Sequence, residues 1–153
     1  MTIPMQEFDR RFVEGFAQLL DGAGVGIRWL APDAGAYDPS DTGIGLGAFP
    51  TLTDRAVALS TYALTDDPVY GDSTVGLQVL TRSAGTDPRD VWALDNAISD
   101  ALLGRWDFDL PTGIHIVQLT PGPRTELPRD QSQRWIRTAS YVCLTFRATS
   151  HRL

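Results

Sequence analysis

The segment LTRSAGTDPRDVWALDNAISDALLG, residues 80–104, decides the fold because it joins the end of a strand to the clearest helix in the chain. Asp87 is a favourable helix N-cap, and Pro88 suits the first helical position. An apolar stripe at helical spacing follows, and Gly104 is placed to end it. The pattern therefore predicts a helix over residues 88–103.

The break before this helix contains a glycine, and such loops at a helix N-terminus can bind phosphate. The phosphate-binding spacing G-x-x-x-x-G-K-[ST] is missing, however, and the carboxylates of Asp87 and Asp90 stand where an anion would dock. Asp90 also opposes the helix dipole favourably in the first turn. We interpret the segment as a capped corner. The run GIGLG at 43–47 neither follows an expected strand nor opens a helix, so it indicates a flexible loop.

The rest of the chain predicts a second helix and several strands. Apolar residues at helical spacing, with a proline before them and a glycine after them, predict a helix over residues 4–21. Alternating patterns predict strands over residues 25–30, 55–64, 74–82, 113–120 and 134–148. In the last strand, alternate residues from Ile136 to Phe146 share one face. Two Gly- and Pro-rich stretches, 31–50 and 121–133, are expected to be long loops.

This order of elements predicts the fold class. Direct strand-to-strand connections are more frequent in this order than strand–helix–strand connections. This favours an α+β domain with a mostly antiparallel sheet and two main helices packed on one face. The chain has 153 residues, the size of one ordinary domain, so we expect a single domain over residues 1–153.

Composition narrows the function classes. The formal net charge is −6, and arginine supplies all 13 basic residues, whereas a standalone nucleic-acid binder is normally basic. Cys143 is the single cysteine, which excludes an intrachain disulfide and fits a reducing compartment. The N-terminus lacks the pattern of a signal peptide, and no apolar run is long enough to span a membrane. We expect a soluble protein made inside the cell.

Candidate catalytic and metal-binding residues are scarce. His115 and His151 are the only histidines, and neither has a metal-ligand spacing with Cys143. Cys143 lies in an expected strand and is interpreted as a buried, inert thiol. The aspartates near positions 66–72 and 33–41 are typical of turns rather than of a calcium loop. No catalytic, metal or cofactor residue is therefore predicted; an enzyme that uses Cys143 or a carboxylate pair remains a remote alternative.

Several local phrases carry a resemblance to a known family. They are PTLTDRAVAL at 50–59, a Tyr-x-x-x-Asp-Asp-Pro phrase at 62–68 and VGLQVLTR at 75–82, together with the helix around Ile98. In that helix Asn96 stands where the family pattern has a second aspartate. With its order of elements, the chain resembles the tail terminator, or minor capsid, proteins of long-tailed bacteriophages.

The resemblance implies a non-enzymatic virion protein at the junction of tail and neck, assembled in the host cytoplasm. Such proteins form a six-membered ring that caps the tail tube, stops its growth and joins it to the head. The implied partners are further copies of the chain, the tail tube protein and a head-completion or neck protein, with DNA passing through the lumen without specific binding and no membrane partner. An acidic lumen suits that passage, because it repels phosphates. A head-side stopper or adaptor, or a tube subunit, remains the alternative.

A ring needs two different contact surfaces on each subunit. The two long loops suit this requirement, and we expect the outer face of the helix at 88–103, with Asn96 and Ser99, to meet a neighbour as well. The candidate subunit or partner interface residues are Asp38, Asp41, Asp66, Asp67, Arg89, Trp92, Arg124, Arg129 and Arg134.

Overall fold

The computed structural model describes residues 3–152. Its elements are α1 (Met5–Asp21), β1 (Gly43–Leu46), β2 (Ala56–Asp66), β3 (Asp72–Arg82), α2 (Pro88–Leu102), β4 (Trp106–Asp109), β5 (His115–Leu127) and β6 (Ile136–Phe146). The six strands form one sheet in the order β1-β2-β3-β6-β5-β4. Among the strands of residues 3–152, only β1 and β2 pair in parallel, and all other neighbouring strands are antiparallel. This confirms the predicted α+β fold with a mostly antiparallel sheet.

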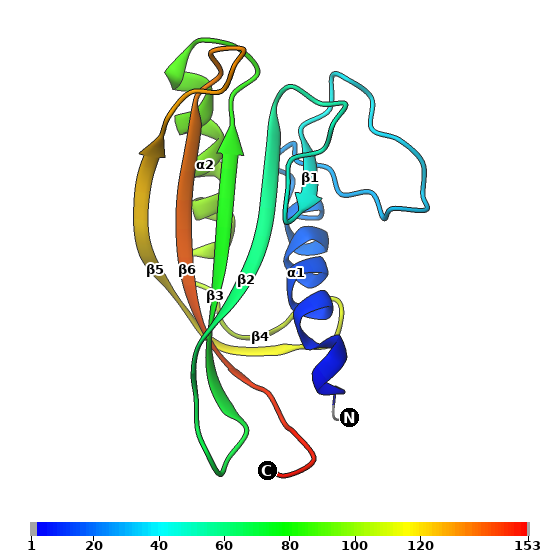
Figure 1. The fold of residues 1–153 in the computed structure, drawn as a ribbon, viewed down its shortest axis with the longest axis vertical. Coiled ribbons are helices and arrows are strands. Elements are labelled where there is room, and N and C mark those ends of the chain that lie inside the picture. Colours follow the sequence, from blue (N-terminus) through cyan, green and yellow to red (C-terminus); the bar gives the residue numbers. More distant parts are fainter. Residues whose placement is uncertain (1–2, 153) are drawn as a thin grey trace.

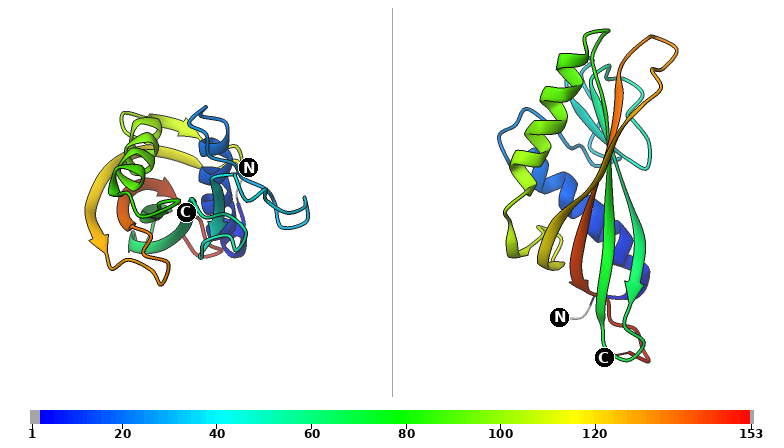
Figure 2. Two further views of the ribbon diagram at one scale, coloured as in Figure 1. Left: turned by 90° about the horizontal axis from the view of Figure 1, so that it is seen from above. Right: turned by 90° about the vertical axis from the view of Figure 1, so that its left-hand side faces the viewer.

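Both helices pack on the same face of the sheet (Figures 1 and 2). On α1, Phe8, Phe12 and Phe16 repeat every fourth residue, so they line one side of the helix, and each is at most 2% exposed. On α2, Leu94 and Ile98 lie on the corresponding buried side. The two apolar stripes join the inward side chains of the strands in one core cluster. The predicted placement of the helices is confirmed.

The two faces of the sheet differ in burial. On β3, Val75, Leu77 and Val79 are at most 1% exposed, as their alternation predicts. On β6, Tyr141 and Cys143 face the core, and the alternate set from Ile136 to Phe146 lies on the open face. Apolar residues occupy both faces of β6, so alternation alone does not identify the inner one.

The start of α2 matches the predicted capped corner. The carboxylate of Asp87 accepts a hydrogen bond from the backbone N–H of Arg89 at 3.0 Å. Asp90 accepts from the backbone N–H of Ala84 at 2.7 Å and from Nε of Arg55 at 2.8 Å. These carboxylates satisfy N–H donors that an anion would otherwise use. The helix ends at Leu102, one residue before the predicted boundary.

The predicted strand over residues 25–30 is wrong. Only a single bridge, between Arg28 and Gly43, forms there. Gly24 and Gly26 adopt positive φ values of 72° and 79°, which interrupt an extended run. Conversely, the expected loop over 31–50 contains β1, because the glycine-rich run that looked flexible lies beside β2 as a parallel edge strand.

The second expected loop also needs correction. Residues 121–127 continue β5 instead of forming a loop, and β4 was not predicted. Because β4 pairs only with the stretch from His115 to Gln118, the rest of β5 is a sheet edge. Pro121 and Pro123 are tolerated there, since an edge strand leaves outward N–H positions without a partner.

The pairing register of the strands determines which parts of the two sheet edges lie at the same height along the strand direction. One continuous row runs Leu46, Leu59, Val79, Ala139, Arg124. β1 and the second half of β5 therefore lie level with one another on opposite edges of the sheet (Figure 1). The β2–β3 hairpin projects beyond the helices at the other end, and the sheet curls around the core when seen from above (Figure 2).

Candidate functional site

A charged cluster lies between α2 and the strands beneath it. The side chain of Asp95 is 1% exposed, and its Oδ2 atom lies 3.2 Å from Nη1 of Arg124 on β5 and 3.2 Å from Nη1 of Arg137 on β6. Its other oxygen has no hydrogen-bond partner among the described residues. Burial raises the pKa of Asp95 and outweighs the opposing effect of the two guanidinium groups.

Hydroxyl groups extend this cluster. The hydroxyls of Ser99 and Tyr141 lie 2.7 Å apart, and Arg124 donates to both. Trp92 donates from Nε1 to Glu126 on β5 at 3.0 Å. Ser99 is 8% exposed, so its expected place on the outer face of the helix is wrong. Together these contacts fix α2 on the sheet and direct Arg124 inward.

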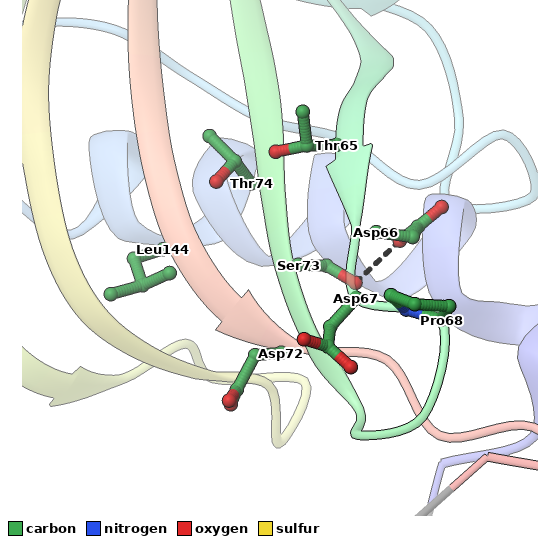
Figure 3. A pocket seen from close by; sticks show the side chains of 8 residues that line it. All are labelled: Thr65, Asp66, Asp67, Pro68, Asp72, Ser73, Thr74 and Leu144. Atoms are coloured by element: carbon green, nitrogen blue, oxygen red, sulfur yellow. Dashed lines mark hydrogen bonds between the residues drawn. The ribbon is translucent and has the colours of Figure 1, made fainter.

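A second charged cluster lies at the base of the turn that joins β2 to β3, where Asp66 and Ser73 form the last pair of the ladder; we call this place the hairpin base (Figure 3). Asp66 accepts a hydrogen bond from Ser73 Oγ at 2.5 Å, and Nη1 of Arg147 and of Arg152 each lie 3.3 Å from it. The hydrogen bond from Ser73 is the main cause that lowers the pKa of Asp66, and the two arginines act in the same direction. The guanidinium of Arg147 also lies 4.8 Å from the ring centroid of Phe8. The last described residues are thereby held against α1 and the hairpin.

Three aspartates flank a cavity of about 350 Å³ beside this cluster (Figure 3). Asp67 accepts hydrogen bonds from the backbone N–H groups of Val69 and Tyr70 at 2.8 and 2.7 Å, which is the predicted role in a turn. These bonds lower the pKa of Asp67. Within residues 3–152, no three His, Cys, Asp or Glu side chains are arranged to hold a metal ion.

A third feature is an apolar cavity beside the edge strand β1, of about 350 Å³, which we call the β1 pocket. The hydroxyl of Tyr37 accepts from the backbone N–H of Leu30 at 2.9 Å and donates to the carbonyl of Ile44 at 2.7 Å. This phenol is therefore satisfied inside the protein and fixes the wall of the pocket. The lining residues are Trp29, Leu30, Pro32, Tyr37, Ile44, Gly45, Leu46, Ala48, Phe49, Pro50 and Thr51.

The predicted interface residues in the β5–β6 connection make mostly internal contacts. The guanidinium of Arg129 lies 4.9 Å from the Trp135 ring centroid. Arg134 pairs with Asp130 at 2.7 Å and with Asp54 at 2.8 Å. These contacts rigidify the connection, and among residues 3–152 Arg129 has no ion pair.

The remaining candidates lie in separate places. Asp41 pairs with Arg28 at 3.1 Å, and Asp38 accepts from the backbone N–H of Ser40 at 2.9 Å, both in the loop before β1. Arg89 pairs with Asp87 at 2.8 Å, and its side chain is 82% exposed. The structure thus distributes the nine candidates over the loop before β1, the hairpin base and the region around α2 and the β5–β6 connection.

Two structural features of the candidate site were missed by sequence reasoning. Asp95 lies four residues after Val91 and three before Ile98, so it shares the apolar stripe of α2 with them. A charged residue at such a position indicates a buried charge, and this signal was available in the sequence. The β1 pocket combines side chains from residues 29 to 51, and no spacing rule brings these together.

One form of the enzyme alternative depends on Cys143, whose environment does not favour a thiolate. The thiol is 0% exposed, and burial raises its pKa to about 12. Activated cysteines have lowered pKa values and are accessible, so this thiol stays protonated near neutral pH. The predicted burial of this thiol is confirmed. His115 lies between Asp109 and Asp107 at 2.7 and 2.9 Å, and the bond with Asp109 is the main cause that raises its pKa.

Comparison with known proteins adds information about the fold. No family model and no curated protein sequence matches the chain. Among solved structures, the chain is similar to a chain of the virion of a native gene transfer agent particle, with a TM-score of 0.57 and 14% sequence identity. The similarity covers 91% of this chain and 96% of that one. At this identity, the two proteins share a fold over almost their whole lengths.

The helices were also compared with the requirements of a membrane span. In residues 3–152, neither α1 nor α2 combines the length and apolarity needed to cross a bilayer.

Proposed function

We propose that the protein is a structural component of a phage-like virion and that it acts as a ring-forming tail terminator. The observation that carries this proposal is the fold similarity to a virion chain, which extends over 91% of this chain and 96% of that one. Similarity at 14% identity does not specify a position in the particle. That finer assignment is supported by the sequence phrases that resemble tail terminators.

The architecture suits a ring subunit. A rigid sheet carries two different edges, and a heterologous ring uses a different surface on each side of the subunit. The ring, with six members as the resemblance implies, would cap the tail tube and present its other side to a neck protein. The net charge of −6 would keep DNA from adhering to the lumen, because like charges repel phosphates.

Purified protein tests the first part of this proposal. Light scattering over a wide concentration range, with electron microscopy of the same samples, should show closed rings either alone or after addition of the tail tube protein. A strict monomer under all these conditions would contradict the assignment. The ring should also shorten tubes that grow in its presence, since a cap stops polymerisation.

The same experiment separates the two nearest alternatives. A tube subunit should polymerise into long filaments without any partner. A head-side stopper or adaptor should bind the neck protein and leave the length of growing tubes unchanged. The terminator assignment therefore predicts rings, shortened tubes and binding to both proteins.

A further inference from the structure

Two surfaces on opposite edges of the sheet lie at the same level and differ in chemistry. The first is the β1 pocket, whose rim includes Leu46, 37% exposed. The second is the run Pro121–Pro128, which we call the proline edge. The row from Leu46 to Arg124 places them level with one another, and Figure 1 shows β1 and β5 on opposite sides of the molecule. Such a pair of surfaces can meet when copies associate head to tail.

The β1 pocket has the lining of a site for an extended, proline-containing segment. Three aromatic rings, from Trp29, Tyr37 and Phe49, contribute to it together with Pro32 and Pro50. Aromatic-lined grooves bind proline-rich segments because these segments are already extended and lose little conformational entropy. The hydroxyl of Tyr37 is satisfied internally, so a ligand does not need to supply a hydrogen bond to it.

The proline edge supplies such a segment. Pro121, Pro123 and Pro128 are exposed, and no strand within the described residues 3–152 lies on the outer side of this part of β5. A proline donates no backbone hydrogen bond, so at Pro121 and Pro123 a partner must use side-chain packing rather than strand pairing. The segment is held in an extended conformation by pairing with β6, which reduces the entropy cost of docking.

Charge favours a second copy of this chain as the occupant. The loop of residues 31–42 carries Asp33, Asp38 and Asp41 and has no basic residue; Asp41 pairs with Arg28, so Asp33 and Asp38 supply its excess negative charge. Directly after the proline edge, Arg129 is exposed and has no ion pair among the described residues. An acidic loop beside the pocket and the exposed Arg129 guanidinium beside the prolines, which lies over Trp135, are complementary across a head-to-tail contact.

We propose that the proline edge of one subunit docks in the β1 pocket of the next, with Arg129 facing the acidic loop. This rests on the proposed ring and names its subunit contact. The prolines have a simpler alternative role, since proline on an edge strand also prevents unwanted strand pairing. The two roles predict opposite effects of removing the prolines.

The double variant Pro121→Ala and Pro123→Ala tests the sign of that effect. Docking predicts that the concentration needed for ring formation, measured by light scattering, rises about tenfold or more, because packing in the pocket is lost. Edge protection alone predicts unchanged rings or extra aggregation, and either result would overturn the docking proposal. Pro111→Ala, at an exposed proline of the turn between β4 and β5, is the matched control and should leave association unchanged.

Cross-linking tests the contact itself. A variant with Leu46→Cys and Pro123→Cys, treated with a short bismaleimide, should give a ladder of linked subunits, and each single variant should not. Cys143 does not interfere, because it is buried. The control pair Val69→Cys and Pro123→Cys places one thiol on the hairpin tip and should give no ladder.

The two proposals fail in different ways. Rings that form normally but give no ladder, and that tolerate loss of the prolines, would overturn the contact while the proposed function stands. A wild-type protein that never associates, even with the tube protein, would overturn both.

Discussion

The buried cluster beneath α2 and the cluster at the hairpin base have the same composition but different surroundings. Each consists of one aspartate and two arginines: Asp95 with Arg124 and Arg137, and Asp66 with two arginines near the C-terminal end. The side chain of Asp95 is 1% exposed, whereas that of Asp66 is 36% exposed. Accordingly, the pKa of Asp95 is raised by burial and that of Asp66 is lowered by its hydrogen bond.

The comparison shows that counting ion pairs does not predict what a charge contributes. For Asp95, the cost of desolvation opposes the attraction of both arginines. Removal of one member of the cluster therefore leaves a buried charge without its partner and destabilises the fold. For Asp66, solvent reduces both the desolvation cost and the Coulomb attraction, and the hydroxyl of Ser73 decides the direction of the pKa shift. The cluster beneath α2 should therefore determine stability more strongly than the hairpin base.

The largest expected effect is that of Asp95→Ala. It leaves Arg124 without its carboxylate and Arg137 with only the more distant Glu126, at 3.7 Å, so the free energy of unfolding in urea at pH 7 should fall by about 3 kcal/mol. Asp66→Ala should cost only about 1 kcal/mol, because water can solvate part of its cluster. Asp100→Ala, on the exposed side of the same helix, is the control and should change stability by less than about 0.5 kcal/mol. Equal losses for Asp95→Ala and Asp66→Ala would contradict the distinction.

The pH dependence of stability should differ in sign between the two carboxyls. The folded pKa of Asp66 is lowered, so its contribution is present above the unfolded pKa, near 4, and is lost as pH falls through the folded pKa. The folded pKa of Asp95 is raised, so between about pH 4 and that pKa the folded state binds the proton more strongly. Protonation of Asp95 therefore stabilises the fold as pH falls through this window.

Denaturation curves of Asp66→Asn and Asp95→Asn at several pH values separate these terms. On acidification, Asp66→Asn should lose less stability than the wild type, and Asp95→Asn should gain less. The difference in the free energy of unfolding between each variant and the wild type should change by at most about 1.4 kcal/mol per pH unit, the limit for one proton. Parallel curves for the two variants would show that the surroundings of the carboxyls do not differ as the structure indicates.

The hydroxyl of Tyr141 should contribute less than the carboxylate of Asp95. Tyr141→Phe removes the hydrogen bonds with Ser99 and with Arg124 and should lower the free energy of unfolding by about 1 kcal/mol. The double variant with Ser99→Ala should cost less than the sum of the two single changes, because each of them removes the bond between the two hydroxyls. Strictly additive losses would show that the two hydroxyls act independently.

The sequence predicted the elements whose signals are local. Asp87 and Pro88 start α2, and the alternation of β3 identifies its buried face, because capping and periodicity act within a few residues. The predictions that failed concern residues whose structure depends on partners that are distant in the sequence. β1 contains two glycines and becomes a strand only because β2 lies beside it, and Pro121 and Pro123 are compatible with β5 only because no strand adds to that edge.

Local sequence patterns predicted less of the candidate site than of the fold. Arg124 was expected at an interface from its place in a polar stretch, but its partners Asp95 and Tyr141 come from α2 and β6. Arg129, by contrast, is exposed in the structure, as its surroundings in the sequence indicate. Charge and exposure can be read from local pattern, whereas the pairing of a long arginine side chain depends on tertiary packing.

Salt should produce the smallest difference between the two clusters. Mobile ions screen charges that water reaches and affect a buried pair much less. The stability difference between wild type and Asp66→Asn should therefore shrink by a few tenths of a kcal/mol between low salt and about 1 M NaCl, where the Debye length is about 3 Å. The corresponding difference for Asp95→Asn should stay nearly constant over the same range. Urea denaturation of all three proteins at both salt concentrations measures this directly, and equal changes for the two variants would mean that Asp95 is as open to solvent as Asp66.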